Sequence, residues 1–140
     1  MATNNNRFAA MDRDTQRYSD FLSNLNPHPV SKDIVKYVNE NAVVRSIRNL
    51  LLTDRFERLY QPDLGTDLRK MLFEHISSVT AQTISVFVQE TIDKYEPRAK
   101  VISVNVQADE ENNRYIVSLV VMVINKQDPV SFNIVLDRIR

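Results

Sequence analysis

The sequence predicts an α+β fold in which helices pack on one face of a small antiparallel three-stranded sheet at the C-terminal end. Two patterns support this prediction. Apolar residues recur with helical spacing as far as Tyr95, and beyond Arg98 they alternate with polar residues, as in half-buried strands. Polar turns then divide the last part of the chain into three strands that can pair as a meander.

The chain is predicted to consist of a polar N-terminal tail, residues 1–17, and a single α+β domain, residues 18–140. The segment 18–30 is expected to be extended. Pro27 and Pro29 each remove a backbone donor and favour extended geometry in the preceding residue, so a helix interior is excluded there. The apolar side chains of this segment supply enough surface to lie along the domain, and they are Tyr18, Phe21, Leu22 and Leu25.

A short strand is predicted over residues 34–38, followed by a helix that ends near Asp54. Asn39 or Asn41 is expected to cap this helix, because Asn side chains readily accept a hydrogen bond from the first helical turn. Apolar residues then recur at helical spacing, with arginines on the opposite side. These apolar residues are Val43, Val44, Ile47, Leu50 and Leu51.

Residues 55–63 are predicted to form a loop that closes at Gly65, where glycine supplies a turn conformation that other residues adopt at a cost. Thr66 or Asp67 then caps a short helix that extends over residues 68–74.

The strongest helical pattern follows, with a cap at Ser78 or Thr80 and an end at Tyr95, because Pro97 forbids further helix. One face is polar and the other carries a full set of apolar positions, as in an amphipathic helix. The apolar face is formed by Ile84, Phe87, Val88, Thr91, Ile92 and Tyr95.

Three strands are predicted over residues 102–108, 115–124 and 132–136, separated by polar turns at 109–113 and 125–129. The middle strand is apolar at nearly every position, so both of its faces are expected to be covered. A sheet this short leaves open edges, which are templates for a strand from another chain.

Composition excludes several function classes. There is no Cys, which excludes a disulfide scaffold and a cysteine nucleophile and fits a reducing compartment. A single Gly excludes the glycine-rich loops that cradle phosphates, so no nucleotide cofactor is expected. No apolar run approaches the roughly 20 residues that cross a bilayer. The first eight residues lack the apolar core of a signal peptide, so we expect synthesis and use in the cytosol.

The chain also lacks the patterns of nucleic-acid and metal sites. Basic and acidic residues balance at 18 each, which gives no bulk drive toward nucleic acid. The arginines between positions 45 and 58 are interrupted by Asp54 and Glu57, which favours a solvated or salt-bridged face. His28 and His75 stand at no ligand spacing, so a metal site is not expected.

Glu96, Pro97 and Arg98 stand where the long helix ends and the strands begin. Two interpretations of this proline corner, Glu96–Arg98, remain open. The charges could form a solvated pair worth under about 1 kcal/mol. Alternatively, Arg98 could present its donor fork to a partner, on a backbone that Pro97 has already fixed.

Four segments occur in the order Val44–Leu51, Pro62–Leu68, Leu72–Glu74 and Tyr95–Arg98. In this order and spacing they resemble the baseplate wedge proteins of contractile-tailed phages, and the resemblance extends over about residues 18–137. This small sheath-initiator family also has a member in type VI secretion baseplates and has been labelled lysozyme-like.

The resemblance implies a virion structural protein without cofactor or small-molecule substrate, assembled in the host cytoplasm into the tail baseplate. It implies that Glu96, Pro97 and Arg98 dock onto a helical bundle of larger wedge subunits. It also implies that the sheet extends the strand mesh of the tail sheath. We expect the strand containing Phe132, Ile134 and Leu136 to be the pairing edge, because it ends the chain.

An enzyme is the competing class. A lysozyme-like glycoside hydrolase (a muramidase) normally needs two carboxylates about 5 to 10 Å apart, one with a raised pKa. Asp63, Asp67 and Glu74 are the candidates, and Glu74 beside Phe73 is the best acid. Asp67 is equally typical of a first helical turn, and no substrate cleft is evident, so the prediction is that the chain is not an enzyme.

Overall fold

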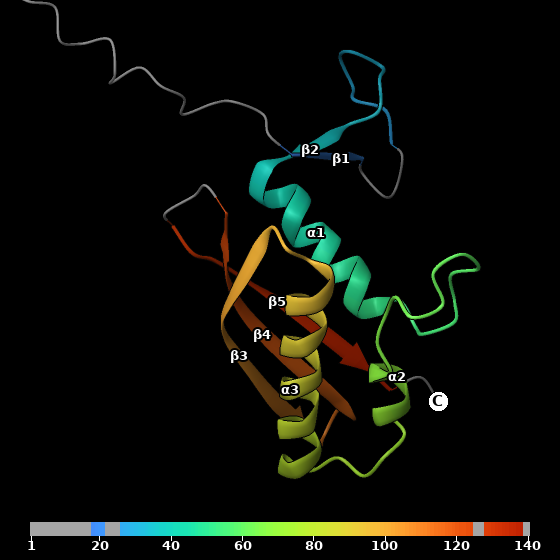
Figure 1. Cartoon of the computed structure of the whole chain (residues 1–140), viewed down its shortest axis with the longest axis vertical. Coiled ribbons are helices and arrows are strands. Elements are labelled where there is room, and N and C mark those ends of the chain that lie inside the picture. The colour runs from blue at the N-terminus through green and yellow to red at the C-terminus, as the bar shows by residue number, and fades with distance from the viewer. Residues whose placement is uncertain (1–17, 22–25, 125–127, 139–140) are drawn as a thin grey trace, which may run out of the picture. The chain divides into compact units, whose positions relative to one another are not determined.

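The computed structural model describes residues 18–21, 26–124 and 128–138 (Figure 1). The predicted tail, residues 1–17, lies outside the described residues. The chain divides into two compact units, Met1–Ala42 and Val43–Arg140.

The first unit contains a small antiparallel pair of strands, β1 (Ser19–Phe21) and β2 (Lys36–Val38). Among the described residues of the predicted extended segment, Ser19–Phe21 form a strand, and β2 is shorter than the predicted strand 34–38. An isolated bridge joins Pro27 and Ile34, and the His28 ring accepts hydrogen bonds from two following backbone amides. His28 therefore has a local structural role in a turn.

Three helices follow, α1 (Asn39–Leu52), α2 (Leu68–Met71) and α3 (Ser78–Tyr95). Helix α2 ends before the predicted residue 74. The cap of α3 is Ser77, whose hydroxyl accepts from Thr80 N at 3.2 Å, so the predicted caps Ser78 and Thr80 are wrong by a few residues. Thr80 already lies in the first turn, where its own hydroxyl donates to His75 O.

Gly65 connects the loop after α1 to α2 and has a φ of +123°. A Cβ at this position would lie 2.6 Å from Thr53 O, so the predicted need for glycine is confirmed. Thr66 then fixes the loop to α1, because its backbone amide donates to Thr53 O and its hydroxyl donates to Leu51 O.

The C-terminal sheet contains β3 (Ala99–Asp109), β4 (Arg114–Val123) and β5 (Val130–Asp137), paired antiparallel in the order β3-β4-β5. The predicted α+β class and the central position of β4 are confirmed. Helix α3 packs against the sheet on one face (Figure 1). The register of β3 shifts between Val101 and Ser103, which leaves Ile102 unpaired and half-exposed in a β-bulge.

The core lies between this sheet and the helices. Ile84, Val88 and Ile92 of α3 are fully buried, whereas Phe87 of the predicted stripe is substantially exposed. The prediction that both faces of β4 are covered is wrong, because only every second residue reaches the core. The buried residues of β4 are Tyr115, Val117, Leu119, Val121 and Val123.

Candidate partner-binding surfaces

The proline corner begins where α3 ends. Glu96 is the C-cap residue of α3, and its backbone amide still donates to Ile92 O at 2.9 Å. Its carbonyl accepts from Ala99 N at 3.1 Å, so the chain reverses within one turn and enters β3. Just before the corner, the Tyr95 hydroxyl donates to Asp63 O and joins the end of α3 to the loop after α1. Hydrogen bonds therefore fix the chain both before and after the corner.

The two charges of the corner form a bidentate pair. Arg98 Nε lies 2.6 Å from Glu96 Oε1, and Arg98 Nη2 lies 2.7 Å from Glu96 Oε2. The Glu96 side chain is only 4 % exposed, whereas the Arg98 side chain is 38 % exposed. Burial alone would raise the pKa of Glu96, but hydrogen bonds from Arg98 and Ser46 outweigh burial and lower this pKa below its ordinary value. The alternative of a solvated pair is therefore excluded for Glu96.

This geometry separates the roles of the three corner residues. The Glu96 carboxylate is used inside the molecule, where it links the end of α3 to Ser46 on α1. Pro97 is exposed and Arg98 is half-exposed, so these two residues form the accessible part of the corner. Glu96 holds the Arg98 guanidinium in a fixed orientation, because two parallel hydrogen bonds allow one plane only.

The outer edge of β5 is defined by the register of the sheet. Arg138 N donates to Asn113 O, so these two residues form a hydrogen-bonded pair, and Arg114 and Asp137 form the next pair of the register. In an antiparallel pair, residues that exchange hydrogen bonds with the opposite strand alternate with residues whose main-chain groups face away. The main-chain groups that face away from β4 belong to Ser131, Asn133, Val135 and Asp137.

The predicted pairing residues Phe132, Ile134 and Leu136 lie on the edge strand, as expected. Their main-chain groups, however, face β4, and the side chains of Ile134 and Leu136 are buried in the core. A strand added to β5 would therefore bond to the residues between them. The alternation of side chains in the sequence predicts which residues face the core, but it does not reveal which amides face outward.

One side chain of helix α1 already reaches the middle of this edge. Arg48 Nη2 donates to Asn133 O at 3.2 Å, so one outward carbonyl of β5 is bonded within the chain. The arginines between positions 45 and 58 do not act as one basic patch, because Arg55 lies 3.5 Å from Asp67 while Arg48 bonds the strand. Val135 and Asp137 follow at the end of the edge.

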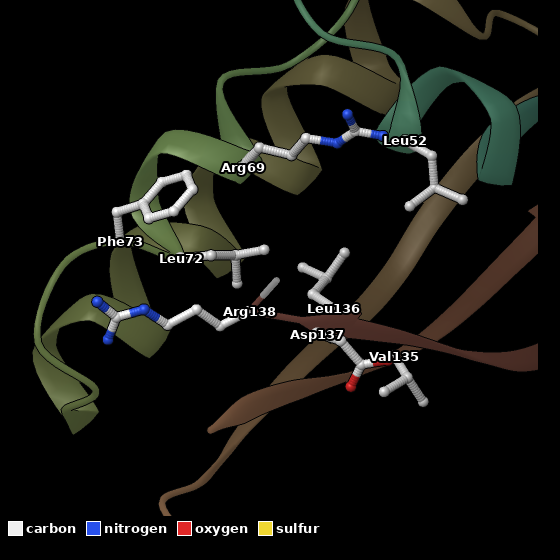
Figure 2. A pocket seen from close by; sticks show the side chains of 8 residues that line it. All are labelled: Leu52, Arg69, Leu72, Phe73, Val135, Leu136, Asp137 and Arg138. Carbon is white, nitrogen blue, oxygen red and sulfur yellow. The ribbon is translucent and has the colours of Figure 1, made fainter. Parts of the chain in front are cut away.

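A groove of about 280 Å³, here called the β5 groove, adjoins this end of the edge. Figure 2 shows Leu72 and Leu136 pointing toward one another, with Leu52 at the end of α1 on the same side. The side chains of Val135 and Asp137 point to the other side of the strand. The complete lining is Leu52, Arg69, Leu72, Phe73, Val135, Leu136, Asp137 and Arg138.

The opposite edge, on β3, differs in character. Residues of β4 opposite Val104, Val106 and Ala108 direct their main-chain groups to β5, so these three residues of β3 face outward. A groove of about 450 Å³ lies beside them, and helix α3 contributes small and polar residues to it. Those residues of α3 are Ser78, Ala81, Gln82 and Ser85.

The carboxylates considered for glycoside hydrolysis are either exposed or engaged in ion pairs. Asp63 and Glu74 are exposed. Asp67 accepts from Lys70 Nζ at 2.8 Å, and this hydrogen bond together with the charges of Lys70 and Arg55 lowers its pKa. A general acid of this class needs a raised pKa, so Asp67 has the opposite of the required property.

The described residues contain no cluster of three or more His, Asp and Glu side chains placed to hold a metal ion. Of the helices in the described part of the chain, none combines the length and apolar content needed to cross a membrane.

Several known proteins are similar to this chain in sequence or in structure. Baseplate wedge protein gp25 of Enterobacteria phage T4 is 31 % identical over 100 residues, which cover 71 % of this chain and 76 % of that protein. A candidate tail lysozyme from Geobacter sulfurreducens is 26 % identical, with a TM-score of 0.64 over 70 % of this chain and 89 % of the other.

The baseplate of the anti-feeding prophage contains a chain with the same fold. It is 20 % identical, with a TM-score of 0.60 over 88 % of this chain and 87 % of that chain. The family model for baseplate wedge protein gp25 matches residues 38–128, which contain α1, α2, α3, β3 and β4 and end before β5. The chain therefore belongs to the baseplate wedge protein gp25 family.

Proposed function

We propose that the chain is a structural wedge component of the baseplate of a contractile phage tail. It docks through the proline corner on a helical bundle formed by larger wedge subunits, and it starts sheath assembly by pairing a strand of the sheath protein with its own sheet. It assembles in the host cytoplasm and remains in the virion. The observation that carries the proposal is an open antiparallel sheet whose edge strand β5 presents outward main-chain groups beside an apolar groove.

Docking through the corner is supported by its rigidity. Pro97 fixes the backbone, and the bidentate bond from Glu96 fixes the Arg98 guanidinium. Few degrees of freedom are lost when such a surface binds, so less ordering entropy opposes docking. An exposed guanidinium plane beside a proline suits helix carboxylates or the carbonyls at a helix C-terminus.

Strand pairing is supported by the topology of the sheet. Main-chain N–H and C=O groups along an open edge provide affinity for an extended segment, and alternating side chains provide its register. Because Arg48 bonds Asn133 O, the freest part of the β5 edge is the stretch from Val135 to Asp137. We place the first contact with a sheath strand there.

A structural role is favoured over a muramidase. Similarity to a candidate tail lysozyme is the one observation that supports an enzyme. Asp63 and Glu74 are exposed, and Asp67 has a lowered pKa, which is the opposite of what a general acid needs. A cell-wall lysis assay in which activity is present and is lost in Glu74→Gln would reverse this assignment.

The docking proposal is tested by Arg98→Ala. We expect the variant to fold and its affinity for the wedge subunits to fall at least about tenfold, as is typical when a charged interface anchor is truncated. Co-purification with those subunits measures the effect. Arg114→Ala is the matched control, because Arg114 is 37 % exposed and is also paired with a carboxylate, Asp109, at 2.8 Å. Equal retention of both variants on the baseplate would contradict docking through the corner.

A further inference from the structure

Side chains from the end of α1 and from the segment after α2 line a groove beside the edge strand β5. Leu52 at the end of α1 and Leu72 and Phe73 after α2 line the β5 groove together with Leu136, the last core-facing residue of β5 (Figure 2). Leu52 and Phe73 are 40 % and 65 % exposed, so the groove leaves apolar surface uncovered. The layer of helices thus covers a space beside β5 that no strand of the described chain occupies.

An added strand would fill this space in a defined way. Neighbouring strands lie about 4.8 Å apart, and side chains directly opposite one another lie on the same face of the sheet. A residue of the added strand opposite Leu136 would therefore direct its side chain into the β5 groove. Residues opposite Val135 and Asp137 would instead point to the other face, where Figure 2 shows those two side chains.

We propose that the β5 groove is a binding site for one large apolar side chain, such as leucine, isoleucine or phenylalanine, on an extended segment that pairs with the end of β5. This inference rests on the strand pairing proposed above and specifies what the pairing segment must contain. A groove of about 280 Å³ holds several waters at roughly 30 Å³ each, and displacing water from its leucine and phenylalanine surface favours an apolar occupant.

The arginines at the rim of the groove determine which charge is favoured in the bound segment near its apolar residue. Figure 2 shows the Arg138 side chain extending along one side, and Arg69 reaches toward Leu52 on the other. Arg69 is 3.4 Å from Asp54 and is partly neutralised, whereas Arg138 makes no ion pair with any residue that the structure describes. Because side chains alternate along a strand, the residue two positions from the apolar one shares its face, so an acidic residue is favoured there and a lysine or arginine is disfavoured.

The test uses the full chain and the acetylated peptide Thr-Asp-Val-Leu-Thr-Val-Thr-Ser, in which Leu is placed for the groove and Asp, two positions before it, lies on the same face. Binding is followed by amide chemical shifts, which we expect to change at Val135 and Asp137. Replacing Leu by Lys in the peptide should weaken binding at least about tenfold. Phe73→Ser should have a similar effect, whereas Phe56→Ser, at an equally exposed phenylalanine outside the groove, should have none.

A further variant separates this inference from the proposed function. Val135→Pro removes an outward N–H that strand pairing needs and leaves the leucine and phenylalanine side chains of the groove unchanged. If Val135→Pro abolishes binding while Phe73→Ser and the Lys peptide bind like the originals, strand pairing stands and the groove assignment is overturned. If Val135→Pro also binds normally, or the Leu peptide does not bind at all, strand pairing at this edge is wrong as well.

Discussion

The proline corner and the outer edge of β5 are opposite kinds of surface. At the corner, both carboxylate oxygens of Glu96 are bonded within the chain, and the exposed Arg98 is already oriented. At the edge, Val135 and Asp137 direct main-chain groups away from the sheet. The first surface has its hydrogen bonds within the chain, whereas the second surface, in the proposed function, is completed by the partner.

This difference determines how each surface responds to mutation. A change at the corner alters internal bonds, so it should affect the stability of the free chain and its dependence on pH. A change at the outward positions of β5 leaves the internal ladder intact, so it should affect partner binding with little effect on stability. The predictions below test this separation.

The largest effect on stability is expected for Glu96→Gln. The amide keeps the shape of the side chain but removes the charge that holds Arg98, and we expect unfolding free energy at neutral pH to fall by about 1–3 kcal/mol. Urea unfolding measures this change. Exposed Glu90→Gln on α3 is the control and should stay within about 0.5 kcal/mol of the original.

The same variant makes a prediction about pH. Because the folded pKa of Glu96 is lowered, its contribution is fully present above its ordinary pKa of 4.5 and is lost as the pH falls through the lowered folded value. The stability difference between the original chain and Glu96→Gln should therefore be largest at neutral pH and shrink below pH 4.5. A difference that stays constant with pH would show that the carboxylate charge is not what stabilises the corner.

A smaller effect is expected for Arg48→Ala. Its bond to Asn133 O is 3.2 Å long and exposed, so its loss should reduce unfolding free energy by about 1 kcal/mol or less. Strand pairing should be retained, because removal of the guanidinium opens one more carbonyl on the β5 edge. Peptide titration of the variant checks this point, with Arg58→Ala on the exposed loop as control. Loss of binding would mean that Arg48 contacts the partner itself.

Much of the fold follows from residue patterns along the chain. The alternation after Arg98 predicts the three strands and their order, and Pro97 predicts the end of α3. The sequence could not predict which face of β4 is buried, because Ile116, Val120 and Met122 are as apolar as the buried residues between them. Burial there depends on where the helices lie, which is set by tertiary packing.

Less of the two candidate surfaces could be predicted from the sequence. Local spacing indicates that Glu96 and Arg98 are near one another, but the hydrogen bond to Glu96 from Ser46 joins residues that are distant in the sequence. Similarly, the outward direction of Asn133 and the bond from Arg48 depend on the register between strands and on α1. Such features arise from contacts between elements, and no short motif encodes them.

The central claim is that the edge of β5 receives the first sheath strand, and two matched proline variants test it most directly. Val135→Pro on β5 and Val106→Pro on β3 each remove one outward N–H, and neither removes a bond within the sheet. Baseplates carrying each variant are assembled and examined for sheath by electron microscopy. The account predicts that sheath fails to form on Val135→Pro baseplates and forms normally on Val106→Pro baseplates. Normal-length sheath on Val135→Pro baseplates would contradict it.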